Sequence, residues 1–283
     1  MPTDVVFMHH GLWGKAIDLI HVAEGLKRQY GCTCIMLDNN VGRTTQGIVN
    51  CGKRCLNAIL QVCDKLEPGS KVSFVGHSLG GLILLEALNL LVTERPTYFD
   101  DRSIICENFM PVASPLLGLT NSVSGLITWF AGVLPGRTFD DLILKTDDLT
   151  ALCTDQLFDR LRKFNRLILV GNLIDDPAVT PMSSLFLADN SEPYPEFESI
   201  VSRLPNASVG GPPSEFEEAV HVKQEELRLK WLMLPWMRFA FRLPRQFGDF
   251  GGTAHHKIIM NPRRDLWGRG AAAVAEIVNL WHS

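Results

Sequence analysis

Short hydrophobic runs alternate with stretches of helical periodicity along much of the chain. The runs fall at 4–8, 32–37, 72–75, 108–113 and 166–173. Between them, apolar residues recur at intervals of three and four over 16–30, 47–65 and 81–91, which is the spacing of a helix with a buried face. This alternation predicts an α/β fold in which helices cover both faces of a mostly parallel sheet. Functional sites of such folds lie at the carboxyl ends of the strands.

The last third of the chain has a different pattern. Proline and glycine interrupt 183–230, which predicts a surface excursion with a polar helix over 215–230. Residues 236–243 (WMRFAFRL) alternate with period two between two prolines, which predicts an edge strand. One face of this strand would carry Met237, Phe239, Phe241 and Leu243, and the other Trp236, Arg238, Ala240 and Arg242. A short strand at 257–260 and a closing helix at 267–281 are expected to follow.

A long segment, 108–136, contains no charged residue, and its apolar residues over 123–134 would cover most of a helix surface. Two interpretations stay open. The segment forms a lid or acyl-chain wall within an insertion at 116–164, or it is a helix buried against the sheet. In the first case Trp129 and Phe130 would contact a substrate. Serine, threonine and glycine dilute it too much for a membrane-spanning helix, so contact with a bilayer surface is the most that we expect.

Composition and charge narrow the class of protein. With 283 residues, of which 46% are hydrophobic and 20% charged, the chain can bury a large core. It has no clear linker, so we expect a single domain over 1–283. A net charge of −4 provides no basic field for nucleic acid. Seven cysteines without a Cys-x-x-Cys pair indicate reduced thiols in an intracellular protein. We find neither a signal peptide pattern at 1–8 nor about 18 consecutive apolar residues.

The clearest chemical signal is Gly76-His77-Ser78-Leu79-Gly80, which lies between a predicted strand and a predicted helix. A side chain on such a tight turn needs glycines two residues away on either side, because a Cβ there would collide with the turn. Ser78 would therefore project its hydroxyl from the end of the sheet as a nucleophile. The N–H of Leu79, at the start of the helix, would face a developing oxyanion.

A second glycine-containing loop, 9–14 (HHGLWG), follows the first predicted strand. Loops at this place can donate a backbone N–H to an oxyanion, since glycine lets the main chain approach the reacting atom. We expect the second donor to be the N–H of Leu12, and Trp13 to contact the substrate. His9 is expected to pack or cap rather than react.

An acid and a base are also found where a Ser-Asp-His chain order requires them. Asp175 and Asp176 follow the predicted strand at 166–173, and His255 and His256 follow Gly251-Gly252 late in the chain. The carboxylate would hold the histidine tautomer, and the histidine would take the serine proton. The residues alone leave open which member of each pair serves.

With these motifs identified, the chain resembles the serine esterase, or lipase-like, family of α/β-hydrolases of eukaryotes. The resemblance extends over nearly the whole length. It rests on HHGLWG, on TTQGI at 44–48, on KVSFVGHSLGGLI at 71–83, on VASPLLG at 112–118, on N-x-x-x-D-x-x-V at 172–179, and on LPWMRFAFRL followed by AHHKI at 254–258.

The resemblance implies an acyl-ester hydrolase acting on lipids such as lysophospholipids or monoacylglycerols, without metal or cofactor. It places the nucleophile at Ser78, the acid at Asp176 and the base at His255. Two departures keep Asp175 and His256 open. Val179 and Pro181 are separated by Thr180 where the family tends to have Val-Pro together, and His256 stands where the family often has Asn.

We therefore expect a serine esterase or lipase of the α/β-hydrolase fold, with a lipid acyl ester as its substrate. Two alternatives remain: a catalytically silent lipid-binding or scaffold protein on the same fold, and an acyltransferase in which an alcohol replaces water. The expected location is the cytoplasm, with peripheral contact to intracellular membranes or lipid droplets left open. The sequence does not indicate an oligomeric state.

Overall fold

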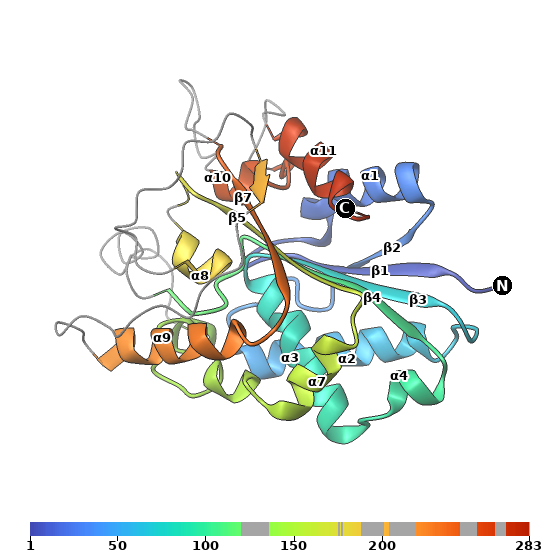
Figure 1. Ribbon diagram of the computed structural model, residues 1–283, viewed down its shortest axis with the longest axis horizontal. Helices are drawn as coiled ribbons and strands as arrows, with labels where there is room; N and C mark the ends of the chain where they lie inside the picture. The colour runs from blue at the N-terminus through green and yellow to red at the C-terminus, as the bar shows by residue number, and fades with distance from the viewer. Residues whose placement is uncertain are drawn as a thin grey trace.

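The computed structural model describes residues 1–119, 136–174, 176, 178–187, 201–203, 219–243, 254–263 and 270–282. One seven-stranded sheet runs through this part of the chain, in the order β2-β1-β3-β4-β5-β7-β6 (Figure 1). All neighbouring strands are parallel except β6, which pairs antiparallel with β7. The strands are β1 (Asp4–His9), β2 (Thr33–Leu37), β3 (Lys71–His77), β4 (Ile105–Val112), β5 (Arg166–Asn172), β6 (Val201–Arg203) and β7 (Trp236–Phe241).

Helices cover both faces of the sheet, as predicted (Figure 1). On one face lie α1 (Ile20–Tyr30), α10 (Ala254–Lys257) and α11 (Ala271–Asn279), and on the other lie α2 (Ile48–Cys63), α3 (Leu79–Glu94), α7 (Asp155–Arg162) and α9 (Ala219–Trp231). The shorter elements are η1 (Ala16–Leu19), α4 (Tyr98–Asp101), α6 (Arg137–Leu142), η2 (Thr150–Leu152) and α8 (Pro181–Leu185). Among the described residues, no helix combines the length and the apolar character that crossing a bilayer would require.

The buried side chains form two hydrophobic clusters, one on each face of the sheet. The α2/α3 cluster contains Phe7, Phe74 and Ile59, whereas the α1/α11 cluster contains Met8 and Val75. Neighbouring residues of β1 and of β3 thus enter opposite clusters, because successive side chains of a strand point to opposite faces. All seven cysteines are free thiols.

The alternation predicted for β7 is confirmed. Trp236 and Ala240 belong to the α2/α3 cluster, whereas Phe239 and Phe241 belong to the α1/α11 cluster. Its predicted position at the edge of the sheet is wrong, because β7 lies between β5 and the short strand β6. The residues of β6 come from the proline-rich excursion, where no strand pattern is visible, and long-range pairing with β7 creates this strand.

The predicted strand at 257–260 is also wrong. Helix α10 ends at Lys257, and a turn follows in which the N–H of Ile258 bonds to the carbonyl of Ala254 and that of Met260 to Lys257. Ile258 and Ile259 are nevertheless fully buried. A short apolar run satisfies either a strand or a buried helical turn, so periodicity alone does not distinguish them. The other predicted strands and the closing helix are confirmed within a few residues.

Residues 120–135, which hold most of the predicted apolar helix and include Trp129 and Phe130, lie outside the described residues. The described residues on the two sides of this segment are joined by a backbone hydrogen bond. The N–H of Leu119 bonds to the carbonyl of Leu142 at 2.8 Å, and both side chains are buried in the α2/α3 cluster. The interpretations of this segment as a lid and as a buried helix both stay predictions, as does the single domain.

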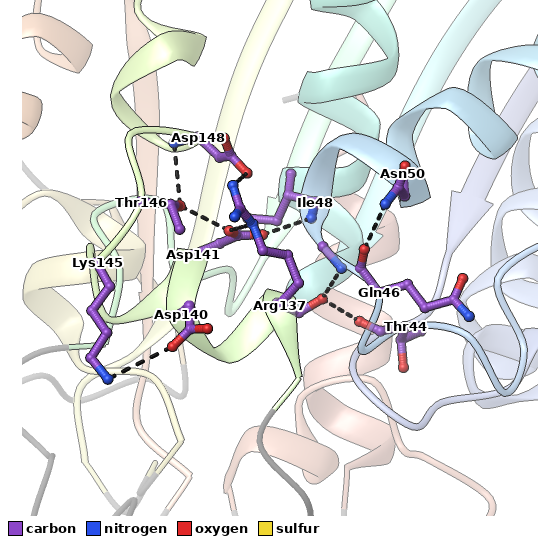
Figure 2. Close-up of polar contacts among 12 residues, drawn as sticks. Thr44, Gln46, Ile48, Asn50, Arg137, Asp140, Asp141, Lys145, Thr146 and Asp148 are labelled. Carbon is purple, nitrogen blue, oxygen red and sulfur yellow. Dashed lines mark hydrogen bonds and ion pairs between the residues drawn. The ribbon is translucent and has the colours of Figure 1, made fainter.

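A buried carboxylate fixes α6 to the start of α2 (Figure 2). Asp141 Oδ2 accepts the N–H of Ile48 at 2.9 Å, and Oδ1 accepts the Thr146 hydroxyl at 2.8 Å and Arg137 Nε at 3.1 Å. Next to it, the Thr138 hydroxyl donates to the carbonyl of Thr44 at 2.7 Å. The first N–H groups of a helix have no acceptor inside the helix. Asp141, which is distant in sequence, supplies the acceptor for the N–H of Ile48, the first residue of α2.

Replacing Asp141 with Ala is therefore expected to lower the free energy of unfolding by roughly 2–4 kcal/mol, because the Ile48 N–H and the Thr146 hydroxyl lose their acceptor inside the protein. The adjacent Asp140→Ala is the matched control. Its carboxylate is 43% exposed and lies 3.7 Å from Lys145, so its removal should change stability by less than about 1 kcal/mol. Urea denaturation of both variants measures the difference, and equal midpoints would contradict the assignment.

Candidate active site

Ser78 lies on a strained turn between β3 and α3. Its backbone angles are φ 55° and ψ −128°, a region that non-glycine residues rarely occupy and that costs about 1–3 kcal/mol. Two backbone bonds hold the turn: the N–H of Ser78 donates to the carbonyl of Val112 on β4 at 2.9 Å, and the N–H of Gly81 donates to the carbonyl of Ser78 at 3.1 Å. The neighbouring strand thus supports the strained residue.

The glycines around Ser78 are required by close backbone contacts. A Cβ on Gly76 would overlap the backbone of Gly81, and a Cβ on Gly80 would overlap the carbonyl oxygen of His9. A Cβ on Gly11 would come within 2.8 Å of the Ser78 Cβ. The loop after β1 therefore packs directly against the serine, as the sequence motifs predicted.

The two predicted oxyanion donors, Leu12 and Leu79, both line the cavity that contains Ser78. Within the described residues, neither backbone N–H makes a hydrogen bond. The next residue, Trp13, has φ 51° and is 39% exposed, and it lines the same cavity. Its N–H donates to the Thr44 hydroxyl at 3.0 Å. Thr44 therefore fixes the loop at the residue after Leu12.

Asp176 is a buried carboxylate that accepts four hydrogen bonds. Oδ2 accepts Asn172 Nδ2 at 2.9 Å and His255 Nδ1 at 3.0 Å, and Oδ1 accepts the N–H groups of Ala178 at 3.1 Å and Val179 at 2.9 Å. Burial by itself raises the pKa of Asp176, but the His255 ring and these donors outweigh it, so the pKa is lowered from the ordinary value. The carboxylate stays charged although it is buried.

His255 lies on the short helix α10 and not on a flexible loop as predicted. Sequence reasoning missed what holds this helix in place. The carbonyl oxygen of His255 accepts Nε2–H of His77 at 2.8 Å, and the two rings lie 4.7 Å apart. His77 stands between Gly76 and Ser78, so this contact ties His255 directly to the serine turn. Its place inside the glycine motif is the only signal that the sequence offers.

The structure brings Ser78 and the His255–Asp176 pair to one cavity. Ser78, His255 and His256 all line it, and Asp176 Oδ2 bonds to His255 Nδ1. No hydrogen bond between Ser78 and His255 is present among the described contacts, and such bonds are often long before substrate binds. Asp175, the alternative acid, is outside the described residues.

His9, the last residue of β1, and His10, the residue after it, are fully buried. His9 contacts the carbonyl of His10 through Nδ1 at 2.8 Å, and its Nε2 accepts Asn40 Nδ2 at 2.9 Å. Burial lowers the pKa of His9 to about 3 and lowers that of His10, so both rings are neutral near pH 7. His9 packs and bonds inside the protein, as expected.

The cavity has a volume of about 730 Å³ including its open part. Its walls differ in character. The α2/α3 cluster contributes apolar side chains, namely Leu119, Leu142, Ala178 and Val179. Polar side chains, namely Asp18, Asn261 and Arg263, come from η1 and from the turn after α10, next to Leu19 and Met260 of the α1/α11 cluster. Ser78 lies at the end of β3, where the two faces meet.

The sheet order, the serine turn after β3 and the acid after β5 define the class of the protein as an α/β-hydrolase fold. Residues 2–190 match the family described as "Putative serine esterase (DUF676)", and the chain belongs to this family. The match includes Ser78 and Asp176. His255 lies beyond it.

Relatives and a solved structure agree with this class. The Saccharomyces cerevisiae protein "Putative lipase ROG1" is 33% identical over 204 residues, covering 66% of this chain and 29% of its own length. "Putative lipase YDR444W" of the same yeast is 36% identical over 169 residues, covering 53% and 24%. The chain thus spans less than a third of these relatives. An arylesterase structure shares the fold, with a TM-score of 0.50 and 14% identity, covering 99% of this chain and 75% of that one.

The lowered pKa of Asp176 generates a prediction about stability and pH. Because the folded-state pKa lies below the ordinary value of 3.8, the charged form stabilises the fold above that value, and this stabilisation is lost as the pH falls through the folded-state pKa. At pH 7, Asp176→Asn is expected to lower the free energy of unfolding by about 1–3 kcal/mol.

Urea denaturation between pH 7 and pH 3 measures this difference, which should shrink below about pH 4. Asp159→Asn serves as the control, since that carboxylate is 72% exposed and should give a small difference throughout. A difference for Asp176→Asn that does not change with pH would contradict a buried, charged Asp176.

Proposed function

We propose that this chain is a serine carboxylic-ester hydrolase that cleaves acyl esters of lipids such as monoacylglycerol or lysophospholipid. The observation that supports it most is that Ser78, on a strained turn, lines one cavity with His255, whose Nδ1 bonds to buried Asp176 at 3.0 Å. A nucleophile, a base and a group that orients the base are the three parts needed for acyl transfer through a covalent intermediate.

In the proposed mechanism, Ser78 Oγ attacks the ester carbonyl carbon while its proton passes to His255 Nε2. The resulting imidazolium gives this proton to the leaving alcohol, and the acyl group stays on Ser78. Water then attacks the acyl-enzyme, with His255 again taking and returning a proton. Asp176 holds Nδ1 protonated and stabilises the imidazolium, so that Nε2 faces the serine.

The N–H groups of Leu12 and Leu79 would bind the oxyanion. Support for this comes from their location in the cavity and from the absence of another acceptor for either N–H within the described residues. The start of α3 adds the positive end of a helix dipole at Leu79. Donors fixed before the reaction stabilise the developing charge without reorganising.

The choice of a lipid acyl group rests on the apolar wall of the cavity, which includes Leu119 and Leu142, and on the yeast relatives described as lipases. Leu119 lies within the uncharged segment 108–136, and Leu142 lies six residues after it. A long acyl chain would bury apolar surface along this wall, at about 25 cal/mol per Å². Short esters would leave it unused, so turnover should rise with chain length.

A fluorophosphonate probe tests the reactive serine. The wild type is expected to be labelled, and Ser78→Ala is expected to lose the label, because only an activated serine reacts readily. Ser103→Ala is a matched control, since Ser103 also has a positive φ (53°) but is exposed on the surface. A folded wild type that remains unlabelled, with and without lipid vesicles, would favour the silent lipid-binding alternative. Labelled enzyme that transfers the acyl group to added alcohol instead of water would favour the acyltransferase.

The bond from Trp13 to Thr44 gives a test of the oxyanion loop. Thr44→Val removes the acceptor of the Trp13 N–H with little change in volume, and kcat is expected to fall about 10- to 100-fold with KM little changed. Thr44→Ser keeps a hydroxyl and should restore most of the activity. Thr45→Val is the control, because no hydrogen bond of the Thr45 hydroxyl is present in the described part. A change in KM alone would contradict the proposed role of this loop.

A further inference from the structure

The polar wall of the cavity is built around one ion pair. Arg263 Nε donates to Asp18 Oδ1 at 2.6 Å, and Arg263 Nη2 donates to Asp18 Oδ2 at 2.5 Å. The two residues are 245 positions apart in the sequence, and both line the cavity that contains Ser78. The reaction mechanism uses neither of them. A two-point pair of this kind fixes the plane of the guanidinium.

The two partners differ in what they offer to the cavity. The Asp18 side chain is only 4% exposed, and Oδ2 also accepts the N–H of Lys15 at 3.0 Å, so its oxygens are used inside the protein. The Arg263 side chain is 35% exposed, and its Nη1 makes no hydrogen bond to any described residue. Asn261 Oδ1 accepts the N–H of Arg263 at 2.9 Å and positions its backbone. Arg263 therefore presents hydrogen-bond donors that are already oriented.

The charges around this wall decide which leaving group it suits. Arg263 and Asp18 neutralise each other, and Asp176 adds a negative charge at His255, which also lines the cavity. Burial keeps the pKa values of His10 and His77 low, so neither ring contributes a positive charge near pH 7. Among the described residues that line the cavity, a phosphate would find no net positive charge. The oxygen of a neutral hydroxyl can accept from the guanidinium without needing one.

The location of the wall decides which part of an ester it would contact. The apolar residues belong to the α2/α3 cluster. The ion pair joins η1 to the turn after α10, where the neighbouring residues Leu19 and Met260 pack in the α1/α11 cluster. The cavity that contains Ser78 is lined from both sides. When Ser78 attacks an ester, the acyl chain and the alcohol extend from the reacting carbon in different directions. With the chain on the apolar side, the alcohol falls on the side of Arg263.

We propose that Asp18, Asn261 and Arg263 form the subsite for the leaving alcohol, and that this subsite takes a neutral polyol such as a glyceryl group. The proposal rests on the proposed esterase function and names the substrate class of that site. Arg263 donates to the free hydroxyl oxygens of the alcohol, and Asp18 holds Arg263 in place and cancels its charge. Among lipid esters, monoacylglycerol is then favoured over esters whose alcohol carries a phosphate.

The test compares kcat/KM for three esters of one acyl chain: monoacylglycerol, the ethyl ester and lysophosphatidate. The double variant Asp18→Asn/Arg263→Gln removes both charges together, so that no buried carboxylate is left without its partner. It is expected to lower the ratio of monoacylglycerol to ethyl ester turnover about tenfold, the effect of one hydrogen bond. A ratio equal to that of the wild type would overturn the proposal.

Asp18→Asn alone tests the charge argument. It leaves Arg263 with a net positive charge in the subsite, so the ratio of lysophosphatidate to monoacylglycerol turnover is expected to rise severalfold. An unchanged ratio in Asp18→Asn would overturn the role given to Asp18. In the double variant, turnover of lysophosphatidate could instead fall more than turnover of monoacylglycerol. That result would overturn the assignment of the subsite to a neutral polyol and favour a phosphate.

Two controls separate these outcomes from a failure of the esterase proposal. Arg102→Gln removes an arginine that pairs with Asp64 at 2.7 Å, and neither residue lines the cavity, so this variant should leave all three rates unchanged. Fluorophosphonate labelling of each variant reports whether Ser78 is still reactive. A wild type that is neither labelled nor active on any ester would overturn the esterase function itself, whereas normal labelling with unaltered ester preference would overturn only the subsite.

Discussion

The strained backbone of Ser78 is the constraint on which the rest of the site depends. A serine with φ 55° at the end of a buried strand is stable only if its surroundings allow no other conformation. Three close contacts provide this: Gly76 against the start of α3, Gly80 against the loop after β1, and Gly11 against the serine itself. The same contacts bring the oxyanion loop and the helix start to the serine. The contacts that hold Ser78 in its strained conformation are therefore the same contacts that place the loop after β1 and the start of α3 around it.

Buried polar groups connect the loops that surround this turn. Asp176 joins the loop after β5 to α10, and His77 joins α10 to the serine turn. Asp141 and Thr138 join α6 to the start of α2, and Thr44 continues this connection to the loop after β1. A buried polar group without a partner costs about 1–3 kcal/mol, so each of these bonds strongly favours one arrangement. The carboxyl end of the sheet is held by side chains, since its loops have no regular pairing of their own.

The proposed division of the cavity follows from its position at the end of the sheet. A site that opens at this edge receives side chains from both faces, and the two faces carry different residues. The α2/α3 face is closed by leucines next to the uncharged segment, whereas the α1/α11 face brings η1 next to the turn after α10. Because Asp18 neutralises the charge of Arg263, the polar wall is suited to hydrogen bonding with neutral groups rather than to binding an anion.

The local pattern of residues determined the main strands and helices and the serine turn. Periodicity predicted the parallel strands and the main helices, because burial of one face acts on every residue of an element. The glycine spacing predicted the serine turn, since sterics over five residues require it. The site roles of Ser78, Asp176 and His255 were expected from motif and chain order and remain proposals.

Only the tertiary structure decided the rest. The pairing of β6 with β7, the turn at 258–260, the bond from His77 to His255 and the Asp18–Arg263 pair all join or orient residues through packing that no local pattern encodes. The resemblance had pointed to Asp176, but the four hydrogen bonds that converge on its carboxylate, including the bond from His255, are visible only in the structure. Contacts between residues far apart in the chain depend on where the sheet places them, and for that reason they become visible only once the chain is folded.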